Sequence, residues 1–485
     1  MKLSALFADI PVTTILGDMD KEITGICYDS RKTQPGFVFV CIVGYETDGH
    51  KYIGSALEKG ASVIVVQDGV SLPDISDDIT LISAANTRKT LASLGAAYFG
   101  HPEQKMKILG VTGTNGKTTV TTLIKSILEQ EGKKVGLIGT NANMIGDIVL
   151  PTERTTPESF ELYALFSDMV DAGVEYVVME VSSHSLELFR VYGIEYAVGA
   201  FTNLTQDHLD FHGTMEKYAD AKKKLFSQSK CGVINIDDAA GRNMLLDIPC
   251  PVLSYSVDAT GDFCAENVAI TAGGVTFDMS YQGKDHPVSL RIPGKFSVYN
   301  ALTAIGTVVS AGIPVERAIC ALQNATGVMG RCETVPTNTD YTVIIDYAHT
   351  PDGLENILST VREFTKKRVI TLFGCGGDRD RTKRPLMGEI AAKLSDFCVV
   401  TSDNPRTEEP SSIIDDIMVG VLKTDCAHIV IENRREAIGY ALDFAEEGDT
   451  IVLAGKGHET YQIIGKTKNH FDEREVIFEH LAARE

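Results

Sequence analysis

The spacing of apolar positions divides the chain into short segments of two periodicities. In the first hundred residues, apolar runs alternate with segments of helical spacing, and the pattern ends at the breaker sequence Gly100-His101-Pro102. The pattern predicts strands at 23–28, 37–42 and 62–66 and helices at 52–59 and 87–99. We therefore expect a small α/β domain over residues 1–103.

The next part of the chain begins with the order strand, helix, strand. A glycine-rich turn lies between a predicted strand at 106–111 and a predicted helix at 118–129, and a strand follows at 135–139. This order predicts a parallel sheet, because the helix carries the chain back to the edge where the first strand began. A second domain over 104–329 is completed by a strand at 176–179 and helices at 297–311 and 318–324.

The last part alternates most regularly and predicts a second open α/β sheet, which is Rossmann-like, over residues 330–485. Its predicted strands are 342–345, 368–373, 397–400, 428–431 and 450–453, and its predicted helices are 354–364, 386–394, 412–422 and 435–445. Three domains agree with the length of 485 residues at about 150 residues per domain. The expected fold class is α/β throughout.

Composition narrows the possible partners. The 66 acidic and 45 basic residues give a net charge of −21, which disfavours general binding to nucleic acid or anionic membranes. No apolar run approaches the roughly 20 residues of a membrane span, and the N-terminus lacks the apolar core of a secretory signal. The ten cysteines are scattered without a CxxC pair. We therefore expect a cytoplasmic protein with reduced thiols that acts on small molecules.

The sharpest chemical signal lies between the strand at 106–111 and the helix at 118–129. It reads Gly113-Thr114-Asn115-Gly116-Lys117-Thr118-Thr119. Glycines let backbone N–H groups turn towards phosphate oxygens at a helix N-terminus, lysine offers a charge to the outer phosphates, and the following threonine can ligate Mg²⁺. The longer Walker pattern would need glycine where Val111 stands, so the match is to a shorter form. A glycine-rich turn without a role is strongly disfavoured.

Polar residues at a strand end and in a later loop suggest a metal site. Glu180 ends the apolar strand at 176–179, beside the expected phosphate loop, where a Mg²⁺ ligand belongs. His208 and His212 are spaced as a helical zinc pair, but HExxH is absent and glycine follows at once, so Mg²⁺ or a substrate is favoured over zinc. A solvent-facing strand end and a polar loop remain the alternatives. The lysines of 218–226 are most simply a solvated helix face.

Two loops of the last domain carry arginines after predicted strands. Gly374–Arg381 bears Arg379, and Thr401–Pro410 bears Arg406 behind a proline that restricts the backbone. Arginine on a rigid loop suits bidentate binding of a carboxylate. A surface ion pair of Arg406 with Glu408 or Glu409 is an equally good explanation from the sequence alone.

Taken together, the motifs resemble the Mur ligase family, and within it the UDP-N-acetylmuramoyl-tripeptide synthetase type. GTNGKTT, EVSSH, DHLD-F-H, YxxAKxxLF, DYAHTPD and DNPR occur in the family's order along essentially the whole chain. The resemblance implies a uridine-nucleotide domain, a central ATPase domain with the phosphate loop, and a C-terminal domain that brings the incoming amino acid. It also implies ATP and Mg²⁺ as cofactors.

The resemblance assigns roles to individual residues. Lys117, Glu180, His208 and Lys222 are the implied catalytic residues, and Lys222 is expected to be carbamylated, which turns a cation into an oxygen ligand for Mg²⁺ with Thr118, Glu180 and His208. ATP contacts are implied for Gly113–Thr119, Asn300, Arg331 and Asp346. Contacts to the UDP-muramoyl substrate are implied for Ser30, Thr155, Thr156, Ser182 and Arg190. Amino-acid contacts are implied for Arg379, Asp403, Asn404, Pro405, Arg406, Gly455 and Glu459.

The expected activity is ATP-dependent addition of meso-diaminopimelate to UDP-N-acetylmuramoyl-L-alanyl-D-glutamate through an acyl phosphate, by a monomer. Diaminopimelate carries a second carboxylate that Arg406 could bind, whereas lysine has none. Use of L-lysine and a folylpolyglutamate synthetase-like ligase remain alternatives. A nucleotide-dependent switch would bind ATP without ligase chemistry. An oxidoreductase is disfavoured because no predicted strand is followed by GxGxxG.

Overall fold

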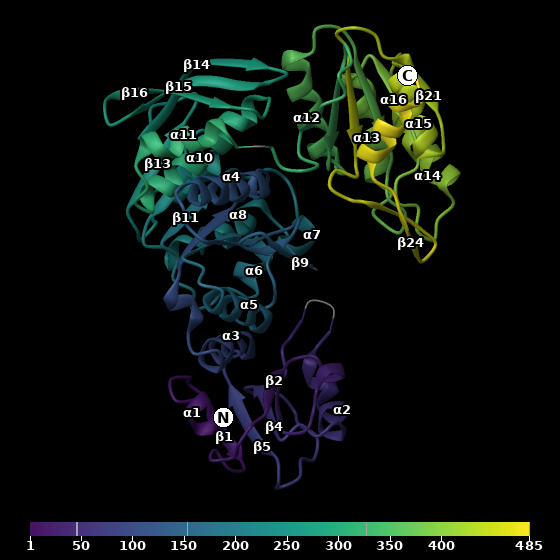
Figure 1. The fold of residues 1–485 in the computed structure, drawn as a ribbon. Coiled ribbons are helices and arrows are strands. Elements are labelled where there is room, and N and C mark those ends of the chain that lie inside the picture. Colours follow the sequence, from purple (N-terminus) through teal and green to yellow (C-terminus); the bar gives the residue numbers. More distant parts are fainter. Residues whose placement is uncertain (45–46, 153, 326, 485) are drawn as a thin grey trace. The chain divides into compact units, whose positions relative to one another are not determined.

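A computed structural model of the chain describes residues 1–44, 47–152, 154–325 and 327–484. The chain forms two units, which are drawn in one view in Figure 1 and described here one at a time. Unit 1 comprises Met1–Lys117, Leu128–Ile234 and Asp238–Leu253. Unit 2 comprises Thr118–Ile127, Asn235–Asp237 and Ser254–Glu485.

The N-terminal part of unit 1 is a five-stranded sheet in the order β1-β5-β4-β3-β2, with β1 antiparallel and the others parallel. Alternate residues of its strands face opposite layers: α1 and α3 cover one face and α2 the other. The strands are β1 (Thr13–Leu16), β2 (Gly25–Cys27), β3 (Phe37–Val40), β4 (Val63–Gln67) and β5 (Thr80–Ala84). The helices are α1 (Leu3–Leu6), α2 (Ile53–Glu58) and α3 (Thr87–Tyr98).

The second sheet of unit 1 has the strand order β12-β11-β6-β10-β7-β8-β9, in which β12 to β7 are all parallel and β8 and β9 are antiparallel. The strands are β6 (Lys107–Thr112), β7 (Val135–Ile138), β8 (Asn143–Ile145), β9 (Ile148–Leu150), β10 (Tyr176–Glu180), β11 (Val198–Phe201) and β12 (Gly232–Asn235). The helices of this region are α5 (Ser159–Asp171), α6 (Ser183–Glu187), α7 (Leu209–His212), α8 (Met215–Lys223) and α9 (Ala239–Met244). Helix α4 (Lys117–Gln130) follows β6 in the chain, and its residues Thr118–Ile127 belong to unit 2. Because β6 and β10 are central and parallel, their carboxyl ends bring separate loops to one edge.

Unit 2 begins with a mostly antiparallel group of strands and two helices. The strands are β13 (Val252–Ser256), β14 (Phe263–Thr271), β15 (Gly274–Tyr281) and β16 (Lys284–Leu290), and the helices are α10 (Lys295–Ser310) and α11 (Val315–Gln323). The sequence pattern predicted the two helices but not these strands. The register of β14 on β15 shifts between Glu266 and Ala269, which interrupts the alternation that marks a strand.

The C-terminal sheet of unit 2 has the order β17-β18-β22-β19-β20-β21, parallel except for β17. Helices α12, α13 and α14 cover one face, and α15 and α16 cover the other. The strands are β17 (Glu333–Val335), β18 (Thr342–Asp346), β19 (Val369–Phe373), β20 (Phe397–Val400), β21 (Ala427–Val430), β22 (Thr450–Ala454) and the separate hairpin β23 (Tyr461–Ile464) and β24 (Thr467–His470). The helices are α12 (Pro351–Phe364), α13 (Lys383–Leu394), α14 (Pro410–Val421), α15 (Arg434–Phe444) and α16 (Glu473–Ala482).

The α/β fold class predicted from the sequence is confirmed. Every strand and helix that the pattern predicted is present, with ends that differ by a few residues. In the C-terminal sheet, consecutive strand residues such as Ile344 and Ile345 are buried on opposite faces. Burial on both faces explains why these strands appear as continuous apolar runs. No helix among the described residues is both long enough and apolar enough to span a membrane.

Candidate active site

The predicted phosphate loop joins the end of β6 to the start of α4. Gly113 has φ +150° and lies so close to Thr202 that a side chain would collide with it, and Gly116 has φ +87°, so both positions require glycine. The Lys117 ammonium donates to the carbonyls of Gly113 at 3.0 Å and Thr114 at 2.8 Å. The lysine therefore folds back over the loop, where phosphate oxygens would be equivalent acceptors.

Glu180 is the last residue of β10 and pairs in register with Val111 of β6. Its carboxylate is buried, and it accepts hydrogen bonds from Thr140 N at 2.9 Å and Thr140 Oγ1 at 3.0 Å. The strand-end argument from the sequence is thus correct: the carboxylate lies at the edge of the sheet from which the phosphate loop begins. A solvent-facing strand end is excluded, because Glu180 is 1% exposed.

Lys222 lies on α8 and is buried, which contradicts the simplest interpretation of 218–226 as a solvated helix face. Its side chain crosses to the phosphate loop, where Nζ donates to Gly113 O at 2.7 Å, and it lies 4.4 Å from the ring centroid of Tyr218. Burial, followed by the nearby Lys117 charge, lowers the pKa of Lys222 well below its ordinary value. The neighbouring Lys224 follows the original interpretation, since it pairs at the surface with Glu187.

The histidines near this loop form an aromatic group without the geometry of a helical zinc pair. His208 has φ +51° and precedes α7, so it is not on the same regular helix as His212. The ring of His184 lies 4.8 Å from that of His208, and His212 Nε2 lies 2.9 Å from Ser183 Oγ. Burial, with the two neighbouring histidines, lowers the pKa of His184 to about 4.

The donor chemistry around the phosphate loop fits Mg²⁺ better than zinc. Within the described ranges, no three His, Cys, Asp or Glu side chains come together as a metal-binding group. Zinc sites need such a group, whereas Mg²⁺ is commonly held by one or two protein oxygens together with phosphates and water. The buried carboxylate of Glu180 is an oxygen ligand of that kind.

Most of the residues implied for the UDP-muramoyl substrate are gathered next to Glu180. Thr156 Oγ1 donates to the Glu180 carbonyl at 2.8 Å and accepts from Ser182 N at 3.2 Å, and Arg190 Nη1 donates to Thr156 O at 3.3 Å. Thr155 Oγ1 lies 3.0 Å from Thr140 Oγ1. Ser30 lies apart from this group, in a short turn where its carbonyl accepts from Lys59.

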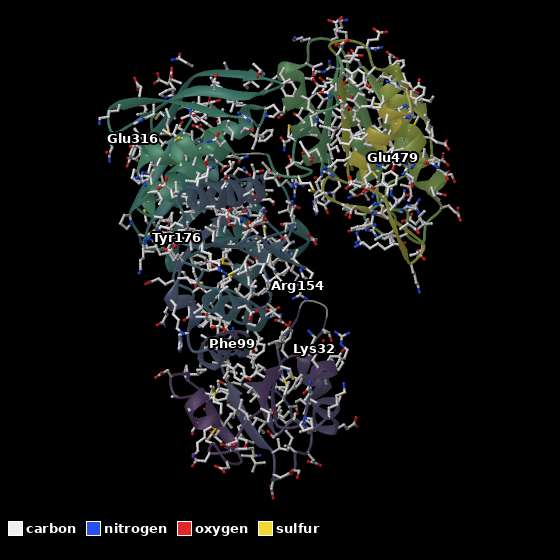
Figure 2. All side chains as sticks on the ribbon, in the orientation of Figure 1. Lys32, Phe99, Arg154, Tyr176, Glu316 and Glu479 are labelled. Carbon is white, nitrogen blue, oxygen red and sulfur yellow. The ribbon has the colours of Figure 1, made fainter. Side chains whose placement is uncertain are left out.

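A buried glutamate surrounded by arginines was not anticipated from the sequence. Glu158 is 5% exposed, and its carboxylate lies 3.3 Å from Arg88, 3.4 Å from Arg154 and 3.2 Å from Arg190. Arg154, labelled in Figure 2, is the most exposed of the three. Three guanidinium groups around one carboxylate leave a net positive charge next to Thr155 and Thr156. That charge favours an anionic substrate.

Two of the implied ATP contacts lie together in unit 2. Asp346, at the end of β18, accepts from Cys332 N at 2.7 Å and Ala348 N at 2.8 Å, while the Arg331 guanidinium lies 4.9 Å from the ring centroid of Tyr347. Burial raises the pKa of Asp346, and the charge of Arg331 opposes the rise. Asn300 is buried on α10.

The implied amino-acid contacts come from loops at the carboxyl ends of three adjacent parallel strands. Arg379 follows β19, Asp403–Arg406 follow β20, and Gly455 and Glu459 follow β22. Asn404 Nδ2 donates to Glu459 Oε2 at 2.9 Å, which joins two of these loops. Arg379 is exposed, and its guanidinium donates to Asp378 O at 3.0 Å.

Arg406 does not form the surface ion pair that the sequence left open. Its Nη1 donates to Gly377 O at 2.9 Å and to Asn404 O at 3.4 Å, while Glu408 pairs with the buried Arg384 at 2.8 Å. The backbone of Arg406 has φ +52°, an uncommon conformation for a residue with a side chain. Because its contacts are to carbonyls, the guanidinium keeps its full positive charge for a ligand.

Comparisons with known proteins match the chain along most of its length. The Mur ligase family, catalytic domain, matches residues 22–98, the Mur ligase middle domain matches 111–308, and the Mur ligase, glutamate ligase domain matches 330–457. UDP-N-acetylmuramoyl-L-alanyl-D-glutamate--2,6-diaminopimelate ligase 1 of Clostridium acetobutylicum is 51% identical over 483 residues, covering 99% of both chains. The ligase with the same substrates from Clostridium perfringens is 50% identical over 492 residues, covering 100% of both.

A solved structure of a UDP-N-acetylmuramoyl-L-alanyl-D-glutamate--2,6-diaminopimelate ligase has the same fold. It aligns with a TM-score of 0.72 at 30% identity and covers 100% of this chain and 99% of its own. Identity near one half over 99% of the chain, together with the three matched domains, shows the family. The chain belongs to the Mur ligase family.

Proposed function

We propose that this chain is an ATP-dependent ligase that joins 2,6-diaminopimelate to UDP-N-acetylmuramoyl-L-alanyl-D-glutamate in the synthesis of a peptidoglycan precursor. The observation that carries the proposal is that Arg406, whose guanidinium contacts backbone carbonyls, and the acidic residues Asp403 and Glu459 lie in loops at the same edge of the C-terminal sheet. Such a group suits an acceptor that bears both carboxylate and ammonium groups. The names of relatives at 50–51% identity support the same substrates.

The reaction follows from the chemistry of the groups at the phosphate loop. The γ-carboxylate of the D-glutamate residue attacks the terminal phosphorus of ATP, which gives an acyl phosphate and ADP. An amine of the acceptor then attacks the acyl carbon, an amide bond forms, and inorganic phosphate leaves with loss of a proton from the amine. Lys117 and the loop N–H groups hold the transferred phosphoryl group, because this chemistry depends on positioning and charge neutralisation.

Mg²⁺ would be held by Glu180 with Thr118, His208 and Lys222, and when bound it neutralises charge on the phosphates. As a free amine, Lys222 cannot supply an oxygen, so its role requires the carbamylation that the family resemblance implies. Burial of the amine against Gly113 O is compatible with that modification, since it keeps the group close to the phosphate loop. Intact-protein mass spectrometry at neutral pH, with and without added bicarbonate, should find one carbamyl group in the wild type and none in Lys222→Arg.

Meso-diaminopimelate is the acceptor that we propose over lysine. The carboxylate at the distal end of diaminopimelate pairs with Arg406. Lysine has no such carboxylate, so its binding would cover the Arg406 guanidinium without giving it an anionic partner, which is unfavourable. Arg379, Asn404, Pro405 and Gly455 complete the proposed acceptor site, and Ser30, Thr155, Thr156, Ser182 and Arg190 the proposed muramoyl site. A folylpolyglutamate synthetase-like activity is disfavoured by the relatives named above.

The test is phosphate release by the purified protein with ATP, Mg²⁺ and UDP-N-acetylmuramoyl-L-alanyl-D-glutamate. Parallel reactions contain meso-diaminopimelate, L-lysine or no amino acid. Release that depends on diaminopimelate supports the proposal, and release only with lysine keeps the ligase chemistry but rejects the acceptor. Absence of release in all three rejects the function. Since ATP and the UDP-sugar are cytoplasmic metabolites, we also propose that the protein acts in the cytoplasm. We further propose that it is a monomer, which sedimentation of the purified chain tests.

A further inference from the structure

A buried lysine joins the two loops that hold most of the proposed acceptor contacts. Lys456 follows β22, and its side chain is 0% exposed. Its Nζ lies 3.2 Å from Asp403 Oδ1, 3.2 Å from Asn404 Oδ1 and 3.5 Å from Glu459 Oε2, and it donates to Tyr461 O at 2.7 Å. One ammonium group therefore contacts three residues to which the family resemblance gave acceptor roles, although Lys456 was given none.

The contact to Asn404 determines how that side-chain amide is turned. Asn404 Oδ1 accepts one hydrogen bond from the Lys456 ammonium and another from Ile463 N at 2.9 Å, so two donors point at this atom. The other end of the amide, Nδ2, then points to Glu459 Oε2 at 2.9 Å. If the amide were reversed, two donors would face an NH₂ group, which has no acceptor capacity. Lys456 thus fixes the direction in which Asn404 donates.

The charges of this group do not balance. Asp403 and Glu459 contribute two negative charges and Lys456 one positive charge, and Asp403 is 6% exposed. The charged partner of Asp403 Oδ1 is the Lys456 ammonium at 3.2 Å, which Asp403 shares with Glu459. Two carboxylates that share one ammonium group leave an excess negative charge in a largely buried place, and an ammonium group of a ligand would neutralise it.

Gly455 lies beside the second oxygen of Asp403. A side chain at this position would begin 3.6 Å from Asp403 Oδ2, and the backbone there has φ +115°, which glycine adopts readily. A side chain at position 455 would therefore stand next to Asp403 Oδ2, whereas glycine places no side-chain atom there.

We propose that Lys456 is a positioning residue for the acceptor amino acid, holding Asp403, Asn404 and Glu459 so that their remaining polar atoms receive an acceptor ammonium group. This inference rests on the proposed function. Lys456 itself does not touch the acceptor, because its three N–H groups are directed at protein oxygens. Its loss releases two carboxylates that then repel each other and frees the Asn404 amide to turn.

The test compares Lys456→Met and Lys456→Gln, which remove the charge, with Lys456→Arg, which keeps it. Removal of the charge should raise KM for meso-diaminopimelate at least about tenfold, the loss typical of one charge-assisted contact. KM for ATP and for the muramoyl dipeptide should stay within about twofold, and kcat should fall less than KM rises. The arginine variant should recover part of the KM effect. Lys466→Met, at an exposed position on the adjacent hairpin, is the control and should match the wild type.

The outcomes separate this inference from the proposed function. If the wild type releases no phosphate with diaminopimelate, the proposed function fails and the inference fails with it. If the wild type is active and KM for diaminopimelate is unchanged in both charge-removing variants, only the inference is overturned. Far-ultraviolet circular dichroism checks folding. If both variants are unfolded, Lys456 serves stability instead, which also overturns the inference.

Discussion

At the scale of single residues, the contacts of Lys117 show what nucleotide binding must change. Its ammonium is bonded to the carbonyls of Gly113 and Thr114, and a phosphate would replace these neutral acceptors by charged ones. The exchange favours binding, because a charge-assisted hydrogen bond is roughly twice as strong as a neutral one.

Replacement of Lys117 by alanine should therefore abolish turnover. We expect phosphate release to fall at least about a hundredfold, the loss typical of removing one donor that stabilises developing charge. Lys133→Ala is the matched control, since Lys133 pairs with Glu175 at the surface. Near-normal release by the Lys117 variant would contradict the assignment of the phosphate loop.

Arg406 should decide acceptor binding without affecting the nucleotide. In Arg406→Ala, we expect KM for meso-diaminopimelate to rise about ten- to a hundredfold, because hydrogen bonds to a charged group contribute about 1.5–3 kcal/mol. KM for ATP should be unchanged. Steady-state kinetics with each substrate varied in turn measures both values, and an unaltered KM for diaminopimelate would count against the proposed contact.

Residue patterns predicted the site unevenly, for a physical reason. Glu180 was found because a strand end and a loop after a parallel strand meet at one edge, which local sequence reveals. The burial of Lys222 was missed because its partner, Gly113 O, lies 109 residues away. The arginines around Glu158 were missed for the same reason, since Arg88 is 70 residues distant.

At the scale of elements, Arg384 of α13 holds two site loops together. Its guanidinium is fully buried and pairs with Glu408 at 2.8 Å and with Asp416 at 2.9 Å. Glu408 in turn accepts from Asp378 N, and Thr407 Oγ1 donates to Asp378 Oδ1 at 2.8 Å. The helix thereby links the loop of Arg379 to the loop of Arg406.

Arg384→Met should destabilise the protein and loosen this link. We expect the free energy of unfolding to fall by roughly 2–3 kcal/mol. This loss is at or below the lower end of what breaking a buried ion pair usually costs, because the two carboxylates are about a quarter exposed and partly screened by water. Urea unfolding at neutral pH measures it. Arg381→Met is the control, since Arg381 pairs with the same Asp416 from an exposed position and should matter little.

The same variant predicts a pH dependence with a definite sign. Arg384 is the main cause that lowers the pKa of Glu408, to about 2. A lowered carboxyl pKa gives stability that is complete above the ordinary value of about 4.3 and is lost as the pH falls towards 2. The difference in unfolding free energy between the wild type and Arg384→Met should therefore become smaller as the pH falls from about 4.3 towards 2. A difference that stays constant with pH would contradict the ion-pair explanation.

Element prediction from the sequence succeeded for the strands of the C-terminal sheet from β18 to β22 and failed for β14, and the two differ in their burial. The inner strands of the C-terminal sheet, β18, β19, β20 and β22, are covered on both faces, so their apolar runs are nearly unbroken. In β14, by contrast, buried Phe263 and Ala265 are followed by mostly exposed or half-buried positions around a register shift at Asn267, which has φ +52°. A strand with that pattern has no clear periodicity.

At the scale of the whole molecule, the division into domains 1–103, 104–329 and 330–485 remains a prediction. The C-terminal sheet offers the clearest test, because its six strands and five covering helices all lie within residues 330–485. A segment with two apolar faces covered by its own helices has the core that independent folding requires.

A fragment of residues 330–485 should therefore fold on its own. We expect a single cooperative unfolding transition in urea and native-like circular dichroism, as is usual for a domain of this size. A longer fragment, 254–485, is the comparison, since it adds β14–β16, α10 and α11. Cooperative unfolding of the longer fragment alone would move the boundary towards the N-terminus.

The left-handed backbone of Arg406 has a consequence for how this protein responds to selection. A residue with a side chain at φ +52° costs about 1 kcal/mol relative to glycine, and Asp378 in the facing loop shares this conformation. A screen of random variants for heat resistance alone should thus enrich glycine at position 406. The selected variants would be more stable to heat but less specific for the acceptor amino acid. Selection for stability in this protein must therefore be combined with a screen for acceptor specificity.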